Sequence, residues 1–245
     1  MCNKNTRKRG IKLKYLIIDE RMRAIEKETL KKLGFELKEI KQNKEIYTEI
    51  SSHVDIFTCK IGNKLIVEPS QYDNLKIGEK GSEKIENKYP YDIKYNVFTI
   101  GKKAIHNFQY TDRKILETLK DQNYELINTV QGYTNCSIAL IDENSVIVTD
   151  KGLFKILEKH GIDVLYITDE LDIKLLNKDG YSNRKGFIGG SIAKIDNKIV
   201  VFGDLNKIDQ ENKIRKFIES KGIEIIDFKD LDVIDYGGVV EINDN

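Results

Sequence analysis

Three side chains of this sequence could together perform chemistry on an electrophilic carbon atom. Cys136 offers a thiol, His53 an imidazole and Asp55 a carboxylate. A thiolate can attack such a carbon, an imidazole can carry a proton to a leaving amine, and a carboxylate can hold a cation. An imidazolium next to Cys136 would also lower the pKa of its thiol. Cys136, His53 and Asp55 are therefore the candidate catalytic residues.

Each of these residues also has a structural interpretation. Cys136 could be a small buried residue that begins a core strand, and His53 could cap a turn. Cys59 lies in the middle of an expected strand, so we assign it to the core. His106 follows a strand, and His160 closes an expected helix, where a cation suits the helix dipole. We expect both of these histidines to be structural.

The charge balance bears on the class of partner. The chain has 41 Lys and Arg against 40 Asp and Glu, a net charge of +1. A protein that binds nucleic acid by neutralising phosphates usually has a basic excess or a basic patch. The only tight basic cluster lies within residues 1–10, which we interpret as a flexible, solvated tail. We expect one domain over residues 11–245 and no nucleic-acid partner.

Other classes lack support in the sequence. The three cysteines, Cys2, Cys59 and Cys136, have no paired spacing, which argues against a disulfide framework and against a zinc site. The apolar runs are far too short to span a membrane, and the N-terminal region lacks the apolar core of a secretion signal. Neither glycine-rich nucleotide motif is present. We expect a cytoplasmic protein without a metal, a cofactor or a membrane partner; the oligomeric state stays open.

A repeated pattern indicates which elements position these residues. Four segments share a β-rich run, a short turn and a second β-rich run, which predicts four hairpins. They are Val54–Val67, Tyr95–His106, Cys136–Val148 and Ser191–Phe202. Their turns contain Gly, Asn or Asp, which tolerate the positive φ of tight hairpin turns.

Three of the hairpins are followed by a helix and then a strand. Apolar residues recur at helical spacing in Thr111–Asn123, Lys151–His160 and Asp209–Lys221. Gly161 and Gly222 stand where a helix would stop. The strands expected after these helices are residues 124–130, 162–168 and 223–228.

The two ends of the chain complete the pattern. Lys14–Asp19 predicts a strand, Glu20–Leu33 a helix and Phe35–Ile40 a second strand, while Val239–Ile242 is a spare strand near the C-terminus. If the spare strand pairs with Lys14–Asp19, it completes a first unit and closes a ring of five. The sequence therefore predicts an α/β fold of five pseudo-symmetric units.

Two segments interrupt the repeat. Tyr72–Pro90 takes the place of the helix in the second unit, and Asp169–Gly189 precedes the fifth hairpin. Both are polar and read as long loops, so both are candidate lids. The alternative fold is a doubly wound α/β sheet with antiparallel additions, but such a sheet would alternate single strands with helices.

Five units of this kind resemble the pentein fold, the α/β propeller of arginine deiminases, agmatine deiminases, dimethylarginine hydrolases and amidinotransferases. Ser52-His53-Val54-Asp55-Ile56-Phe57-Thr58 is similar to the His-x-Asp-x-x-Phe-Thr stretch of arginine deiminases. This resemblance implies that His53 is a general acid and base and that Asp55 holds a guanidinium group. The whole pattern also resembles a bacterial branch of the fold whose members are named for the fold alone.

Smaller elements add to the resemblance, and one departs from it. Gly189-Gly190 and Gly237-Gly238 resemble the glycine pairs that lead into central strands of the family, and Phe202-Gly203-Asp204 resembles its Gly-Asp element. In the enzymes, the nucleophilic cysteine follows a glycine pair near the C-terminus. The residues after Gly238 are Val239, Val240 and Glu241, so the family's usual nucleophile is missing.

Two main hypotheses follow. In the first, the chain binds a small guanidino or amidino cation in an axial pocket without catalysis. In the second, it is a Cys-dependent hydrolase of amidine C–N bonds, or an amidinotransferase-like enzyme, that uses Cys136, His53 and Asp55. An unrelated α/β binding protein is a third possibility. Polar and small residues at the starts of the central strands favour a polar cavity. The expected ligand-binding residues are Asn96, Asn135, Gly190, Ser191, Asp204, Gly237 and Gly238.

Overall fold

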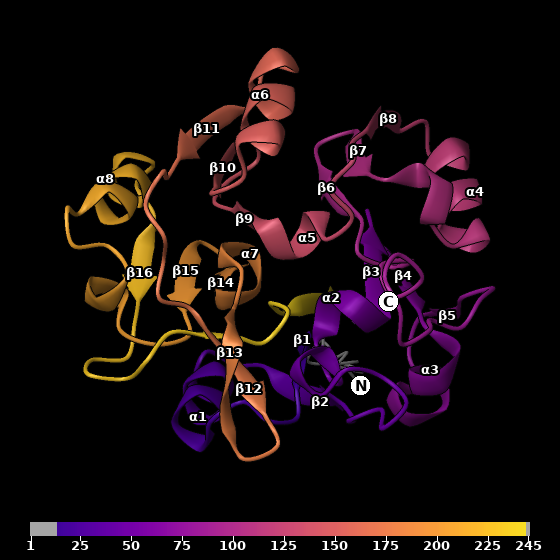
Figure 1. The fold of residues 1–245 in the computed structure, drawn as a ribbon, viewed down its shortest axis with the longest axis horizontal. Helices are drawn as coiled ribbons and strands as arrows, with labels where there is room; N and C mark the ends of the chain where they lie inside the picture. Colours follow the sequence, from indigo (N-terminus) through magenta and orange to yellow (C-terminus); the bar gives the residue numbers. More distant parts are fainter. Residues whose placement is uncertain (1–13, 244–245) are drawn as a thin grey trace, which may run out of the picture.

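A computed structural model describes residues 14–243 of the chain, so the expected tail over residues 1–10 lies outside the described part. The described residues form a mixed α/β fold with six small sheets of three strands each. In each sheet the middle strand pairs antiparallel with one neighbour and parallel with the other, and in five of the sheets a helix connects the middle strand to its parallel neighbour. Figure 1 shows these sheets and their helices arranged around the middle of the molecule.

The five similar sheets contain these elements. The first has β18 (Val240–Asn243), β1 (Lys14–Asp19) and β2 (Glu36–Ile40), with helix α1 (Ala24–Lys32). The second has β3 (Thr58–Ile61), β4 (Lys64–Val67) and β5 (Glu79–Lys80), with α3 (Pro69–Leu75). The third has β6 (Phe98–Ile100), β7 (Lys103–His106) and β8 (Glu125–Asn128), with α4 (Arg113–Asp121). The fourth has β9 (Ile138–Leu140), β10 (Ser145–Val148) and β11 (Asp163–Tyr166), with α6 (Lys151–Lys159). The fifth has β14 (Ile192–Ile195), β15 (Lys198–Val201) and β16 (Glu224–Ile226), with α8 (Lys213–Ser220).

The predicted pairing of the two terminal strands is confirmed. β18 runs antiparallel to β1, with Ile17 opposite Val240 and Tyr15 opposite Ile242. The first sheet is therefore built from both ends of the described chain, and its central strand has a neighbour on each side. Leu16 and Ile17 of that strand are completely buried.

Local sequence explains the helices and their ends. The side chain of Asp112 accepts hydrogen bonds from the backbone N–H groups of Lys114 and Ile115, which fixes the start of α4. Asp150 caps α6 in the same way. The predicted stops also hold, because Gly161 and Gly222 follow α6 and α8 with φ of +76° and +70°.

The starts of three predicted hairpins are single helical turns rather than strands. These turns are α2 (Val54–Phe57), α5 (Thr134–Ser137) and α7 (Ile188–Ser191). In α2, the N–H groups of Val54 and Asp55 donate to the carbonyls of Tyr236 and Gly237, so the turn is held by the chain segment beside it. Its four residues are all buried, and a run this short shows no helical period. The strand predicted over Val54–Phe57 is therefore wrong.

The two predicted long loops are also more ordered than expected. Residues 72–90 include the end of α3 and the strand β5, so the second unit has a helix and a third strand after all. Residues 169–189 include a hairpin of β12 (Lys174–Asn177) and β13 (Gly180–Lys185), which pairs with β17 (Ile234–Asp235) as the sixth sheet. These short strands are polar on most positions, which hides the alternation of a half-buried strand.

Buried apolar side chains gather in four clusters between the sheets and their helices. Cys59 is 2% exposed within one of them, as predicted. His106 is buried and lies 2.6 Å from the Thr111 hydroxyl, and His160 contacts the Ile156 carbonyl at the end of α6. Both histidines therefore have the structural surroundings expected of them. Among residues 14–243, no helix has the length and apolar character needed to cross a membrane.

Candidate functional site

Polar residues from distant parts of the chain meet near the middle of the molecule. They are His53 and Asp55 at α2, Asn96 before β6, Cys136 in α5 and Asp235 in β17. Each is at most 2% exposed. The structure therefore brings the three candidate catalytic residues together, although His53 and Asp55 lie on a helical turn and not on a strand. Figure 1 shows α2 and α5 near the middle of the molecule.

The side chain of Asn96 connects three of these segments. Its Nδ2 donates to the carbonyl of Asp55 at 3.2 Å and to the sulfur of Cys136 at 3.1 Å. Its Oδ1 accepts from the backbone N–H groups of Asn135 at 2.8 Å and Cys136 at 3.3 Å. All the hydrogen-bonding capacity of this buried amide is used, so Asn96 fixes α2 and α5 relative to each other.

Asp235 is the residue of this cluster that sequence reasoning missed. Its Oδ1 accepts from the backbone N–H of Gly237 at 2.9 Å, and its Oδ2 accepts from the N–H of Phe187 at 2.8 Å. Oδ1 also lies 3.7 Å from Nδ1 of His53. A signal was present in the sequence, because Asp235 stands two residues before the Gly237-Gly238 pair.

The glycines at the site leave room for the two carboxylates. A Cβ on Gly190 would lie 1.8 Å from Oδ1 of Asp235, and one on Gly237 would lie 2.6 Å from Oδ1 of Asp55. Such contacts are far inside van der Waals distance. Gly190 and Gly237, both predicted at the site, therefore let the backbone pass directly against Asp235 and Asp55.

Two buried polar side chains of the site have no hydrogen-bond partner. Neither ring nitrogen of His53 and neither carboxylate oxygen of Asp55 has a hydrogen-bond partner. Buried polar groups are normally paired, and exceptions often mark functional sites. Burial lowers the pKa of His53 and raises that of Asp55 to about 6, while the nearby Cys136 and Asn96 oppose the second shift. Burial also raises the pKa of Asp235.

The same burial affects the thiol. The pKa of Cys136 is raised well above its usual value, first by burial and then by the negative charges of Asp55 and Asp235. The neutral His53 does not offset this, so at neutral pH the sulfur carries its proton. The sequence-based expectation of a thiol activated by an imidazolium is not met in this arrangement.

A pocket of about 430 Å³ adjoins the cluster. His53, Cys136 and Asp235 form part of its lining, whereas Asp55 does not. The other lining residues are Tyr47, Glu49, Ile50, Tyr89, Tyr133, Leu175, Arg184, Lys185 and Phe187. The hairpin of β12 and β13 supplies three of these, and Tyr89 comes from residues 72–90, so both of the interrupting segments border the pocket.

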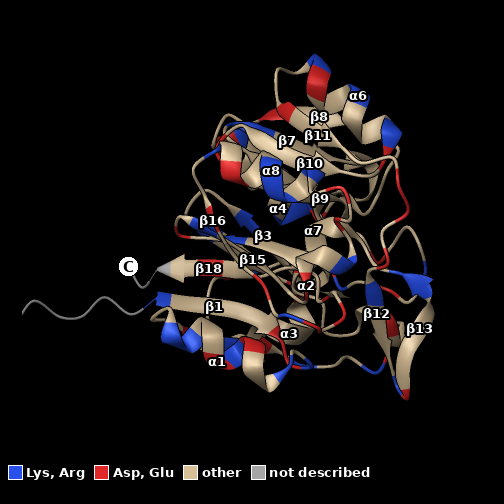
Figure 2. Ribbon diagram, turned by 90° about the vertical axis from the view of Figure 1, so that its left-hand side faces the viewer, with Lys and Arg blue, Asp and Glu red and all other residues tan. Residues whose placement is uncertain are grey.

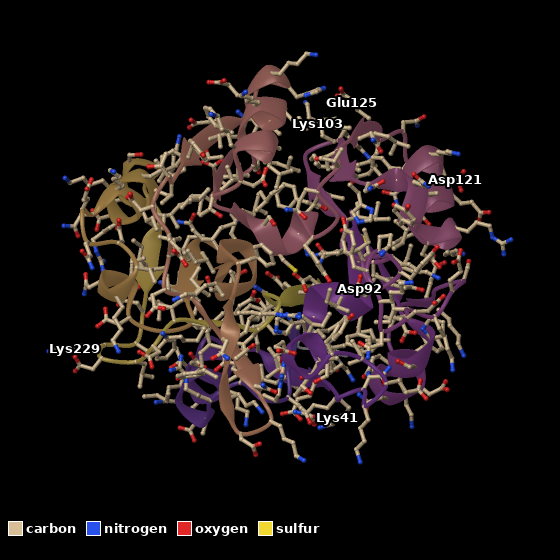
Figure 3. All side chains as sticks on the ribbon, in the orientation of Figure 1. Lys41, Asp92, Lys103, Asp121, Glu125 and Lys229 are labelled. Carbon is tan, nitrogen blue, oxygen red and sulfur yellow. The ribbon has the colours of Figure 1, made fainter. Side chains whose placement is uncertain are left out.

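Aromatic rings form much of the pocket wall. The ring of Tyr133 stacks on Phe187 with centroids 6.1 Å apart and lies 5.8 Å from the ring of Tyr89. The Tyr133 hydroxyl donates to Oδ2 of Asp92 at 2.6 Å, which holds the ring in place. Figure 3 shows Asp92 in the interior, whereas Lys41, Asp121 and Lys229 lie near the edge.

An ion pair near His53 anchors the chain segment that precedes α2. The hydroxyl of Ser52 donates to Oδ1 of Asp19 at 2.7 Å, and Asp19 is paired with Arg21 at 2.7 Å. Arg21 also donates to the carbonyls of Thr48 and Glu49. The segment that leads into α2 is thus fastened to the end of β1.

Four of the predicted ligand-binding residues lie away from this pocket. Ser191 donates its hydroxyl to the Ile188 carbonyl within α7. Asp204 accepts from the N–H groups of Asn206 and Asp230, which lower its pKa and make it a turn-forming side chain. Asn135 and Gly238 line a second cavity on the other side of the central turns.

Metal binding has no support in the described part of the chain. Within residues 14–243, no group of three or more His, Cys, Asp or Glu side chains has the geometry to hold a metal ion. The polar cluster thus contains two carboxylates, one imidazole and one thiol.

Comparisons with known proteins place this geometry in context. A model for a family of unknown function (DUF6873) matches residues 17–240. No curated protein matches the chain. A dimethylarginine dimethylaminohydrolase variant from Pseudomonas aeruginosa, complexed with citrulline, has a TM-score of 0.53 at 9% identity, over 96% of this chain and 100% of that one. A dimethylarginine dimethylaminohydrolase adduct with S-methyl-L-thiocitrulline has a TM-score of 0.52 at 9% identity, over 90% and 92%.

An agmatine deiminase from C. jejuni with substrate bound has a TM-score of 0.47 at 14% identity, over 86% of this chain and 75% of that one. The two dimethylarginine dimethylaminohydrolase structures show that this chain has their fold, the pentein fold. At this level of identity the likeness concerns the fold alone.

Proposed function

The chain belongs to DUF6873, a family of unknown function, and from its pocket we propose that it binds a small guanidino or amidino cation without catalysing a reaction. The observation that carries this proposal is the pair of buried carboxylates, Asp235 and Asp55. Within residues 14–243, neither has a Lys or Arg at ion-pair distance. Burying negative charge without a cation is costly, and a cationic ligand would remove that cost.

The chemistry of the pocket fits a flat cation. A guanidinium or amidinium group presents parallel N–H donors that match a carboxylate, and Asp235 keeps lone pairs free beyond its two backbone hydrogen bonds. Asp55, near it, adds negative charge. The rings of Tyr133 and Phe187 suit the face of such a cation, since aromatic rings attract cations at short range.

The position of the pocket supports the same proposal. We interpret the five similar sheets as a five-unit propeller, closed by the pairing of β18 with β1, with the pocket on its axis. Concave sites where several units meet are where proteins commonly bind small ligands. His53, Asn96, Cys136 and Asp235 come from different segments of this arrangement.

A second candidate function is a Cys-dependent enzyme acting on the C–N bond of an amidine. One observation favours it: the Cys136 sulfur lines the same pocket as His53 and Asp235. Against it stands the protonated state of the thiol. Catalysis would require a rearrangement that generates the thiolate, because the thiolate is the nucleophile.

The test is a calorimetric titration of the full chain with L-arginine, agmatine and guanidinium, and with citrulline as the neutral comparison. The cations should bind, and citrulline should bind at least about tenfold more weakly, since it lacks the charge. Asp235→Asn should reduce cation affinity by about tenfold or more. Asp232→Asn is the matched control, because Asp232 lies three residues away on the surface and pairs with Lys207.

Equal binding of citrulline and the cations, or unchanged affinity in Asp235→Asn, would exclude the proposed site. Release of ammonia or an amine from a bound cation would instead establish the enzymatic alternative. Loss of that release in Cys136→Ser would identify the nucleophile.

A further inference from the structure

A second cavity, of about 500 Å³, is lined by the five strands that pair antiparallel with the middle strands of the five similar sheets, here called the inner strands. Residues of β3, β6, β9, β14 and β18 contribute to its wall. The pocket described above is bordered by β12 and β13, and Figure 2 shows that hairpin on the side of the molecule opposite β18. The two cavities therefore open on opposite sides, with the helical turns α2, α5 and α7 between them.

The floor of the second cavity is backbone. Gly189, Gly237 and Gly238 line it, and a Cβ on Gly189 would lie 2.3 Å from the carbonyl of Asn135. A Cβ on Gly237 would lie 2.6 Å from both Oδ1 of Asp55 and Cβ of His53, so this glycine lies between the second cavity and the acidic cluster. A ligand in one cavity would not occupy the other.

The wall combines apolar side chains with two lysines. The apolar part comes from every inner strand except β3 and includes Phe98, Ile138, Leu140, Ile192 and Val240. Lys60 is partly buried, and its Nζ donates to the backbone carbonyl of Glu241 at 2.7 Å. Lys194 donates to the carbonyl of Asp196 at 3.0 Å.

Among the described residues, no acidic side chain pairs with either lysine, so both ammonium groups can meet an anionic ligand. Among residues 14–243, no carboxylate lies at ion-pair distance from Lys60 or Lys194, which donate to backbone carbonyls, and the charge of Glu241 acts on Lys60 only from farther away. The acidic side chains of the lining are Asp196, which is paired with Lys14 at 2.8 Å, and Glu241. An ammonium group that is partly out of water without an ion pair gains by meeting an anion.

We propose that this second cavity binds a small organic acid with an apolar body. The anionic group meets Lys60 and Lys194, and the body lies against the apolar residues of β6, β9 and β14. This site takes a ligand of the opposite charge to the one proposed for the acidic pocket. The inference uses different residues and does not depend on that function.

The probe is 8-anilinonaphthalene-1-sulfonate, an aromatic body with a sulfonate, followed by its fluorescence on binding to the full chain. Octanoate should displace it, whereas octylammonium, with the same chain and the opposite charge, should displace it at least about tenfold less well. Lys60→Gln should weaken probe binding by about tenfold, since one charge-assisted hydrogen bond is lost. Lys64→Gln should leave it unchanged, because Lys64 is on the same hairpin but pairs with Glu79 outside the cavity.

A second variant guards against a Lys60→Gln protein that fails to fold. Lys194→Gln removes the other lysine of the wall, which is only partly buried and donates to one backbone carbonyl, and should weaken probe binding by about tenfold while near-ultraviolet circular dichroism stays native. Equal displacement by octanoate and octylammonium, or native probe affinity in both folded variants, would overturn the proposal. Asp235→Asn should keep full probe affinity, so failure of this site and failure of the cation site are distinguishable.

Discussion

The side-chain amide of Asn96 donates a hydrogen bond to the sulfur of Cys136 at 3.1 Å, while its oxygen accepts from the backbone N–H of the same cysteine at 3.3 Å. The amide of Asn96 thus contacts both the side chain and the backbone of Cys136. The thiol is also 2% exposed and lies near the carboxylates of Asp55 and Asp235. The hydrogen bonds hold the sulfur beside the pocket. Burial and the two carboxylates keep the thiol protonated, which determines its reactivity.

The thiol of Cys136 should react slowly with iodoacetamide in the native protein at pH 7.4, because the thiolate is scarce and access is poor. We expect Cys136 to be modified about as slowly as Cys59, whose pKa is also raised by burial. Mass spectrometry of time points, with the denatured protein as the reference for full reactivity, measures both rates. Alkylation of native Cys136 much faster than Cys59, slowed by His53→Ala, would contradict the prediction and favour the enzyme.

Asp55→Asn should stabilise the protein at high pH and leave its stability unchanged at low pH. The pKa of Asp55 is about 6 in the folded protein against an ordinary 3.8. The folded state thus binds the proton more tightly, so the contribution of this carboxyl is present below about pH 4 and is lost as the pH rises through 6. The asparagine side chain of the variant does not ionise, so the variant avoids this loss of folding stability, which is about 2–3 kcal/mol at pH 8.

Urea unfolding of both proteins between pH 4 and pH 8 measures the difference. His53 acts with the opposite sign, because its lowered pKa gives stability that is present above 6.5 and lost as the pH falls. Its contribution is common to both proteins and cancels in the comparison. A difference that does not grow with pH would show that Asp55 is not a costly buried charge.

Cation affinity should rise with pH over the same range. L-arginine keeps its guanidinium charge throughout, so the change must come from the protein. With the pKa of Asp55 at about 6, its ionised fraction rises about tenfold between pH 5 and pH 7, and affinity should rise similarly. Titration calorimetry at the two pH values measures this; in Asp55→Asn the rise should be smaller. Affinity that is flat or falls with pH would exclude a role for this carboxylate.

Gly190→Ala should abolish cation binding and destabilise the fold. The added methyl group would lie 1.8 Å from Oδ1 of Asp235, so the carboxylate or the backbone must move. Overpacking of this kind typically costs about 1–3 kcal/mol. Gly152→Ala, in the exposed part of α6, is the control and should have little effect on binding. Thermal unfolding and calorimetry check both effects, and normal arginine binding by a folded Gly190→Ala protein would contradict the assigned geometry.

Removal of residues 240–245 should destabilise the whole fold and not only the first sheet. The deletion leaves one side of β1 unpaired and uncovers apolar side chains, including Ile17. A loss of about 3 kcal/mol would lower the Tm by on the order of 10 °C for a chain of this size. Calorimetric scans compare this variant with one shortened only after Asn243. Equal melting temperatures would show that the β18–β1 pairing contributes little.

The repeated units were predictable because they follow local rules. Lys14–Asp19 was predicted with its observed bounds, and Gly161 and Gly222 end helices where the spacing placed them. Periodicity, capping and turn residues are properties of short windows, so one sequence suffices to detect them.

The site was only partly predictable, because it is assembled from long-range contacts. The turn that carries His53 and Asp55 is helical through bonds to Tyr236 and Gly237, residues far away in the sequence. The position of Asp235 before the Gly237-Gly238 pair is a local signal, but its place in the site depends on the contact with His53, which is distant in the sequence. The pKa of Cys136 likewise depends on neighbours from other units.

The pairing of β18 with β1 has a further consequence, for the order of folding. Ile17 and Val240 are partners across almost the whole described chain, so closing this contact costs more loop entropy than forming any hairpin inside a unit. Each of the other similar sheets can form from a contiguous stretch of sequence. The first sheet must wait for the last strand, and during synthesis β1 stays unpaired on one side until the segment that contains β18 has left the ribosome.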